Sequence, residues 1–145
     1  MPISLAQVSS GGLSDLGLVT AELLANHGAR HVVLVSQSGN ADNSSGQQLH
    51  GTLEHLLQLG GSNLVSVERC DMSHEEEVRL LLDHIRTEHA SINTIIHASG
   101  VARDSWLQNL TSEAVQESFC PKAAGAWYLH NHTLDDDIRH FITSV

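Results

Sequence analysis

The chain has 145 residues, enough for one domain with its own core, and an aromatic content of 3% predicts that the core is aliphatic. Seventeen acidic against seven basic residues give a formal charge of -10, which disfavours binding to nucleic acids and to anionic membranes. The two cysteines lack metal-site spacing, and we find neither a signal peptide nor about 20 consecutive apolar residues, so we expect free thiols and a cytoplasmic location.

Short apolar runs alternate with helical patterns along the chain. The runs that we interpret as strands are 3–8, 31–36, 64–67, 92–97 and 138–145. Helical spacing predicts helices over 16–27 and 47–59, and Ser73 and Thr111 are expected to cap two more. Alternating strands and helices form βαβ units, and right-handed crossovers arrange them as a parallel sheet of order 3-2-1-4-5. We expect a Rossmann-like, doubly wound α/β fold with three αβα layers, which stops after the fifth strand.

The turn after the first strand, from Ser10 to Gly17, reads SGGLSDLG. Turns of this kind bind pyrophosphate through glycine backbone and the N-terminus of the following helix. Gly12 and Gly17 fit the outer glycines of the G-x-G-x-x-G fingerprint, whereas Ser14 occupies the middle position. The pattern predicts a dinucleotide site that includes Gly12, Leu13 and Gly17. The alternative is an ordinary strand-to-helix turn with Ser14 as the N-cap.

Three further strand ends carry candidate cofactor contacts, because open α/β sheets bind ligands at the carboxyl ends of their strands. The candidates are Ser36 and Gln37, then Cys70 and Asp71, and then Ala98, Ser99 and Gly100. Gln37 lies about 20 residues past the glycine turn, where an acid selects NAD and an arginine accommodates NADP. The small residues at 98–100 would let a flat cofactor approach the backbone. For each segment the alternative is an ordinary exit from a strand.

Five segments together identify a family. They are 28–36 (GARHVVLVS), 70–73 (CDMS), 97–101 (HASGV), 109–111 (NLT) and 121–130 (PKAAGAWYLH). Across residues 8–143 the chain resembles the ketoreductase domain of polyketide synthases and animal-type fatty acid synthases, within the short-chain dehydrogenase superfamily. The segment 121–130 is the most specific, because other short-chain dehydrogenases rarely carry it.

The resemblance implies reduction of a β-keto group, held on an acyl carrier protein, by NADPH, alongside the other domains of a synthase. Lys122 matches the family's active-site lysine, which orients the ribose and lowers the pKa of a catalytic tyrosine. Asp71 matches the contact to adenine. Asp104 matches the last acid of a leucine-aspartate-aspartate triplet that correlates with stereochemistry, but the two positions before it depart from the pattern, so no stereochemical type is assigned.

Departures from the family pattern define the alternatives. Ser14 and Asp15 replace glycines of the turn, and Gln37 replaces the arginine that selects NADPH, so binding of NADP is expected to be weak or lost, without strong preference over NADH.

The resemblance puts the catalytic serine and tyrosine beyond the last strand, with Ser144 slightly early and Tyr128 in the wrong helix. Residues 1–145 are therefore expected to form a partial domain, the cofactor-binding half, and to be inactive alone. The main alternative is a degenerate, non-catalytic scaffold; a weaker one is a different nucleotide or sugar-nucleotide binder.

Two kinds of side chain that suggest other chemistry have simpler interpretations. Of the eleven histidines, only His130 and His132 lie close together, and without a third ligand at suitable spacing we interpret them as surface residues. Cys120 has no base partner in the sequence, and we expect it to be inert. The sequence therefore predicts no metal site and no cysteine nucleophile.

Overall fold

A single parallel sheet organises the molecule. The computed structural model describes residues 5–11, 13, 15–38, 46–60, 64–89, 91–99 and 107–143. The strands are β1 (Leu5–Ser10), β2 (His31–Ser36), β3 (Val65–Arg69), β4 (Ser91–His97) and β5 (His140–Thr143). Their order is β3-β2-β1-β4-β5, and all four pairings are parallel. The predicted doubly wound α/β fold and its strand order are confirmed.

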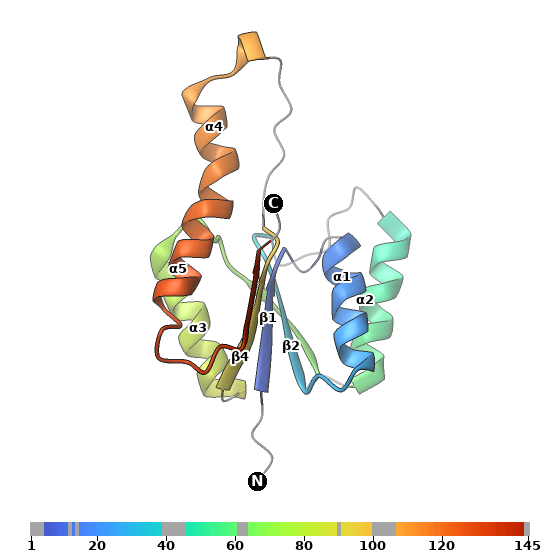
Figure 1. Ribbon diagram of the computed structural model, residues 1–145. Helices are drawn as coiled ribbons and strands as arrows, with labels where there is room; N and C mark the ends of the chain where they lie inside the picture. Colours follow the sequence, from blue (N-terminus) through green and yellow to red (C-terminus); the bar gives the residue numbers. More distant parts are fainter. Residues whose placement is uncertain are drawn as a thin grey trace.

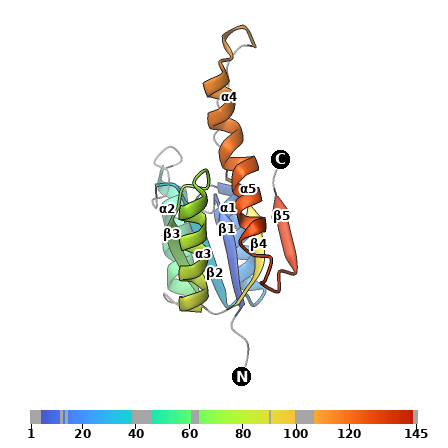
Figure 2. The same ribbon diagram turned by 90° about the vertical axis from the view of Figure 1, so that its left-hand side faces the viewer.

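Helices cover both faces of this sheet, as Figure 1 shows. On one face lie α1 (Asp15–Asn26) and α2 (Gly46–Gly60), and on the other lie α3 (Glu75–His89) and α5 (Gly125–Asn131). The last crossover also contains the 3-10 turn η2 (Leu107–Asn109), α4 (Ser112–Phe119) and the π-helix η3 (Cys120–Ala124). Thr111 caps α4 as predicted, since its side chain accepts a hydrogen bond from the Ala114 N–H at 3.2 Å. In both views α4 projects beyond the carboxyl edge of the sheet, in line with α5 (Figure 2).

Strand β2 shows how the apolar runs build two cores. Val33 and Val35 belong to the cluster beneath α3 and α5, whereas Val32 and Leu34 belong to the cluster beneath α1 and α2. Successive strand residues point to opposite faces, so a strand covered on both sides needs an unbroken apolar run. Among the described residues, no helix is both long and apolar enough to cross a membrane.

Several element boundaries differ from those predicted. β1 begins at Leu5 and continues to Ser10, because Ser9 and Ser10 are buried within the strand and do not form its exit turn. β3 extends to Arg69, and β5 begins only at His140. Ser73 does not cap α3, which begins at Glu75; its backbone N–H and its hydroxyl both donate to Asp71 Oδ1, at 2.9 and 2.6 Å. At the end of β1 and the start of α3, the errors arise because polar residues that resemble an exit turn or a cap have other places in the fold.

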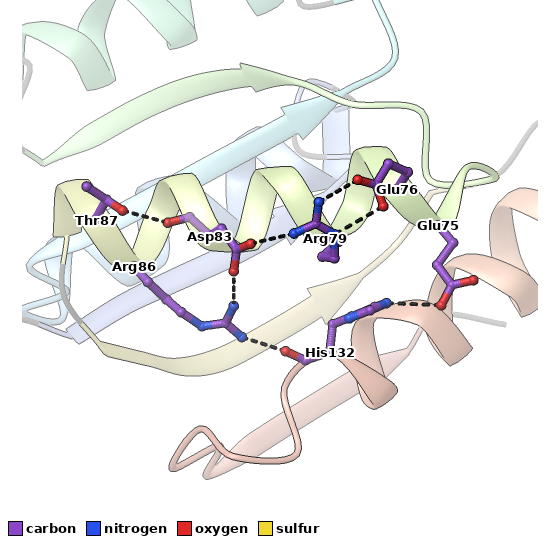
Figure 3. Close-up of polar contacts among 7 residues, drawn as sticks. All are labelled: Glu75, Glu76, Arg79, Asp83, Arg86, Thr87 and His132. Atoms are coloured by element: carbon purple, nitrogen blue, oxygen red, sulfur yellow. Dashed lines mark hydrogen bonds and ion pairs between the residues drawn. The ribbon is translucent and has the colours of Figure 1, made fainter.

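Polar contacts join α3 to the segment between α5 and β5 (Figure 3). Arg86 donates to the carbonyl oxygen of His132 and to both carboxylate oxygens of Asp136, with Nε–Oδ1 at 3.2 Å and Nη2–Oδ2 at 2.6 Å. His132 Nε2 also lies 3.1 Å from Glu75 Oε1. These contacts fix the path by which the chain leaves α5 and returns to the sheet as β5.

Candidate cofactor site

The carboxyl ends of the strands bring most of the sequence candidates to one edge. Central strand β1 pairs with β2 on one side and β4 on the other. The chain runs from β1 through β2 to β3 and then crosses back to β4, so the strand order reverses at β1. In the ladders, Ser10 is opposite Val35 and His97, and Ser36 is opposite Arg69. This edge is the topological switch point at which open α/β sheets bind their ligands.

Gly11 forms the tightest point of the turn after β1. Its φ is +69°, and a Cβ at this position would lie 2.8 Å from the carbonyl oxygen of Ala98. The Ala98 N–H also donates to the carbonyl of Ser10 at 3.1 Å, so the turn lies directly against the exit of β4. Only glycine combines this dihedral angle with this approach.

The remaining candidates of the turn have different surroundings. Leu13 is buried in the core beneath α1 and α2, so only its backbone could meet a cofactor. Gly17 is buried within the first turns of α1. Three predicted positions, Gly12, Ser14 and Gly100, lie outside the described residues, as do Asp104 and Ser144.

Asp71 and Gln37 bind each other. Gln37 Nε2 donates to Asp71 Oδ2 at 3.0 Å, and Ser73 supplies two donors to the other carboxylate oxygen. Burial alone would raise the pKa of Asp71, but the hydrogen bonds from Ser73 and Gln37 and the charge of His74 outweigh it and lower the pKa. Asp71 is therefore an ionised acceptor at the edge of the sheet.

Cys70, which precedes Asp71 and is also a candidate cofactor contact, has a side chain that packs in the core. Burial, together with the negative charges of Glu77 and Asp71, raises the pKa of its thiol to about 12. Its backbone N–H donates to the carbonyl oxygen of Ser36 at 3.0 Å, which continues the β2–β3 ladder. Cys70 can shape the site through its backbone, but a thiol of this kind is not a nucleophile at neutral pH.

Arg69 also lies at this edge. It is the last residue of β3, its side chain is exposed, and its Nε donates to the carbonyl oxygen of Gln37 at 3.2 Å. No local motif marks Arg69 in the sequence as a site residue. The β2–β3 register places it beside the end of β2. The sequence could have indicated Arg69 by one pattern: a basic residue ends the strand that lies next to the position of the ribose selector.

His97 anchors the segment that carries Lys122. The residue is 2% exposed; Nε2 lies 2.8 Å from the carbonyl oxygen of Lys122, and Nδ1 lies 2.6 Å from the hydroxyl oxygen of Ser10. Because a carbonyl can only accept, Nε2 carries the proton and Nδ1 accepts from the Ser10 hydroxyl. Burial lowers the pKa of His97, which keeps the ring neutral.

The approach of this segment to the sheet also depends on Gly125. A Cβ there would lie 2.9 Å from His97 Cε1 and 3.0 Å from Met72 Cβ. Lys122 itself is exposed and lies within the π-helix, a local widening that occurs frequently at functional sites. The lysine backbone is thus held against the ends of β1 and β4 while its side chain meets solvent.

Two other groups of side chains do not add to the site. Within the described residues there is no group of three or more His, Cys, Asp or Glu side chains that could hold a metal ion. Tyr128 is half-buried against the core beneath α3 and α5. Its position in α5 agrees with its assignment to the helix that follows Lys122.

The fold and the arrangement of strand ends define a Rossmann-like α/β domain, the class whose members bind dinucleotides at this edge. The model of the KR (ketoreductase) domain family matches residues 6–144, and the chain belongs to this family.

The similar proteins are much longer than this chain. It is 36% identical over 135 residues to the highly reducing polyketide synthase alnA of Emericella nidulans, covering 93% of this chain and 5% of that protein. It is 34% identical over 134 residues to a mycocerosic acid synthase-like polyketide synthase of Mycobacterium tuberculosis, covering 92% and 6%. Among solved structures, a ketoreductase domain from the bacillaene assembly line superposes with a TM-score of 0.83 at 28% identity, covering 95% of this chain and 32% of the other.

Proposed function

We propose that this chain supplies the cofactor-binding half of an NADPH-dependent ketoreductase. The substrate is a β-ketoacyl group on an acyl carrier protein, and the partners are the other domains of a polyketide or fatty acid synthase. The observation that carries the proposal is the anchoring of the Lys122 segment, through His97, to the edge that also holds the Gly11 turn and Asp71. The contact is made through the backbone carbonyl of Lys122, and the side chain of this residue is exposed.

The described residues fit a dinucleotide. The glycine turn after β1 and the start of α1 would hold the pyrophosphate, because backbone N–H groups at a helix start bind anions. Asp71 would accept a hydrogen bond from the adenine amino group. The Lys122 ammonium would bind the ribose hydroxyls and lower the pKa of a tyrosine general acid. The cofactor, when bound, supplies the hydride.

Titration calorimetry of NADPH into the chain tests the proposal. We expect saturable binding to one site and weaker binding by Lys122→Ala, with Arg139→Ala, on the loop before β5, as a control for the loss of one positive charge. No binding by the wild type would contradict the proposal.

A polypeptide of these 145 residues should not itself consume NADPH when a β-ketoacyl thioester is added. Its one tyrosine packs against the core and is not available as the general acid. Consumption of NADPH that depends on the substrate, measured on the pure protein, would contradict this expectation.

A degenerate scaffold without cofactor is the second candidate, and two residues favour it. The Gln37 side chain is already bound to Asp71, and Asp15 begins α1, where the pyrophosphate would lie. Two unit charges about 6 Å apart repel by about 3 kcal/mol at an effective dielectric near 20. If the chain is such a scaffold, wild type binds neither NADPH nor NADH, and the double variant Asp15→Gly, Gln37→Arg gains binding.

A further inference from the structure

Arg69 places a guanidinium at the position where Rossmann domains read the ribose. It lies opposite Ser36 in the ladder, and its Nε donates to the carbonyl oxygen of Gln37 at 3.2 Å. In this fold class the end of β2 is where an arginine accommodates the 2′-phosphate of NADP. Gln37 provides no positive charge there, whereas Arg69 reaches the same point from the neighbouring strand.

A hydrogen bond to a backbone carbonyl orients the Arg69 side chain without neutralising its charge. Within the described part of the chain, Arg79, Arg86 and Arg139 each have a carboxylate within 4 Å, but Arg69 is paired with none. Its hydrogen bond to Gln37 uses Nε, and a bidentate contact to phosphate can use the two terminal nitrogens of the guanidinium.

The acids near Arg69 have partners of their own. Asp71 accepts hydrogen bonds from Gln37 and Ser73, and Glu68 Oε1 lies 3.5 Å from His84 Nε2. The Gln37–Asp71 contact also fixes the residue whose carbonyl holds Arg69. The arrangement is therefore organised before any ligand binds, which lowers the entropic cost of binding.

We propose that Arg69 binds the 2′-phosphate of NADPH and supplies the cofactor preference that Gln37 cannot. The inference rests on the proposed function, because it requires a dinucleotide at this edge. It reverses the expectation drawn from Gln37 alone, which is that NADPH is not strongly preferred over NADH.

The test compares 2′,5′-ADP with 5′-AMP by titration calorimetry, since the two nucleotides differ only in the 2′-phosphate. We expect the wild type to bind 2′,5′-ADP about tenfold tighter or better, as one charge-assisted contact provides. Arg69→Gln should abolish this ratio while leaving the affinity for 5′-AMP unchanged. Arg30→Gln, an exposed position just before β2 at the opposite edge, should preserve the ratio. Gln37→Arg added to Arg69→Gln should restore it.

The outcomes separate this inference from the proposed function. Binding of both nucleotides with equal affinity by the wild type, or an unchanged ratio in Arg69→Gln, overturns the role of Arg69 and leaves cofactor binding intact. Failure of the wild type to bind either nucleotide overturns the proposed function and the inference with it. Circular dichroism of each variant identifies any loss of folding. Arg69→Lys retains the positive charge without the two terminal guanidinium nitrogens, and it should give an intermediate ratio of the affinities for 2′,5′-ADP and 5′-AMP.

Discussion

At the scale of single residues, the Lys122 segment depends on a buried histidine and a glycine. Both ring nitrogens of His97 have partners, the Ser10 hydroxyl and the Lys122 carbonyl, which satisfies a polar group that burial would otherwise destabilise. Gly125 leaves room for the His97 ring. The two residues act together because the ring can reach the Lys122 carbonyl only if the helix that follows lies close to the sheet.

Substitution of Gly125 tests this close approach. Gly125→Ala should lower the free energy of unfolding by about 1–3 kcal/mol, because the added methyl group overpacks the contact with His97 and Met72. Gly51→Ala in α2 is the matched control, since a methyl group added there would meet nothing within 4 Å, and it should stabilise the chain by up to about 1 kcal/mol. Urea unfolding measures both; equal effects at the two sites would refute the packing argument.

The neutral state of His97 predicts a dependence of stability on pH. Because burial lowers its pKa in the folded chain from 6.5, the unfolded chain binds the proton more readily. The contribution of neutral His97 to the free energy of unfolding is complete above pH 6.5. It is lost as the pH falls from 6.5 through the lowered pKa of His97 in the folded chain. Urea unfolding at about pH 7.5 and about pH 5.5 should show this loss.

The variant His97→Gln should show a smaller dependence on pH, because it removes one of the titrating groups. The remainder comes from residues such as His89, whose pKa is also lowered, first by burial and then by the charge of His31. Equal pH dependence in the variant and the wild type would show that His97 is not the group responsible.

Whether a site residue could be predicted from the sequence depends on how far apart along the chain its contact partners lie. Asp71 and Lys122 could be found because each lies in a local pattern. The Ser10–His97 hydrogen bond joins residues 87 positions apart, and the Arg69–Gln37 contact joins residues 32 apart. Such pairs depend on strand register, which local patterns do not specify.

At the scale of elements, the last crossover departs most from a simple helix. α4, the π-helix η3 and α5 follow one another without a break, and Pro121 lies at the start of η3. The limits of β2 could be predicted without error because its apolar run ends at polar residues on both sides. The limits of β1 could not, since Ser9 and Ser10 are polar but buried.

Arg86 is the residue that we expect to hold this crossover on α3. Arg86→Met should destabilise the chain by about 2 kcal/mol, because it leaves the partly buried Asp136 carboxylate and the His132 carbonyl without this donor. Arg79→Met on the same helix is the control, since its partners Glu76 and Asp83 are exposed and such pairs contribute little. Thermal unfolding measures both variants, and an equal change in Tm would contradict the assignment.

At the scale of the whole molecule, the strand order could be predicted because right-handed crossovers leave few alternatives for five strands alternating with helices. The exposure of apolar side chains on the surface could not be predicted. Phe119, Trp127 and Ile142 are each more than half exposed, on α4, α5 and the edge strand β5. Whether an apolar residue is covered depends on which elements pack over it, and spacing along the sequence does not report this.

Mapping NADPH binding by nuclear magnetic resonance on the isotope-labelled chain tests the central claim most directly. We expect changes in amide chemical shift to concentrate at the carboxyl edge, at Gly11, Gln37, Asp71, Ala98 and Lys122. The opposite edge, represented by Ala29 and Ser91, should be unaffected. Shift changes at that opposite edge, or no changes at saturating NADPH, would contradict the assignment of this chain as a cofactor-binding half of a ketoreductase.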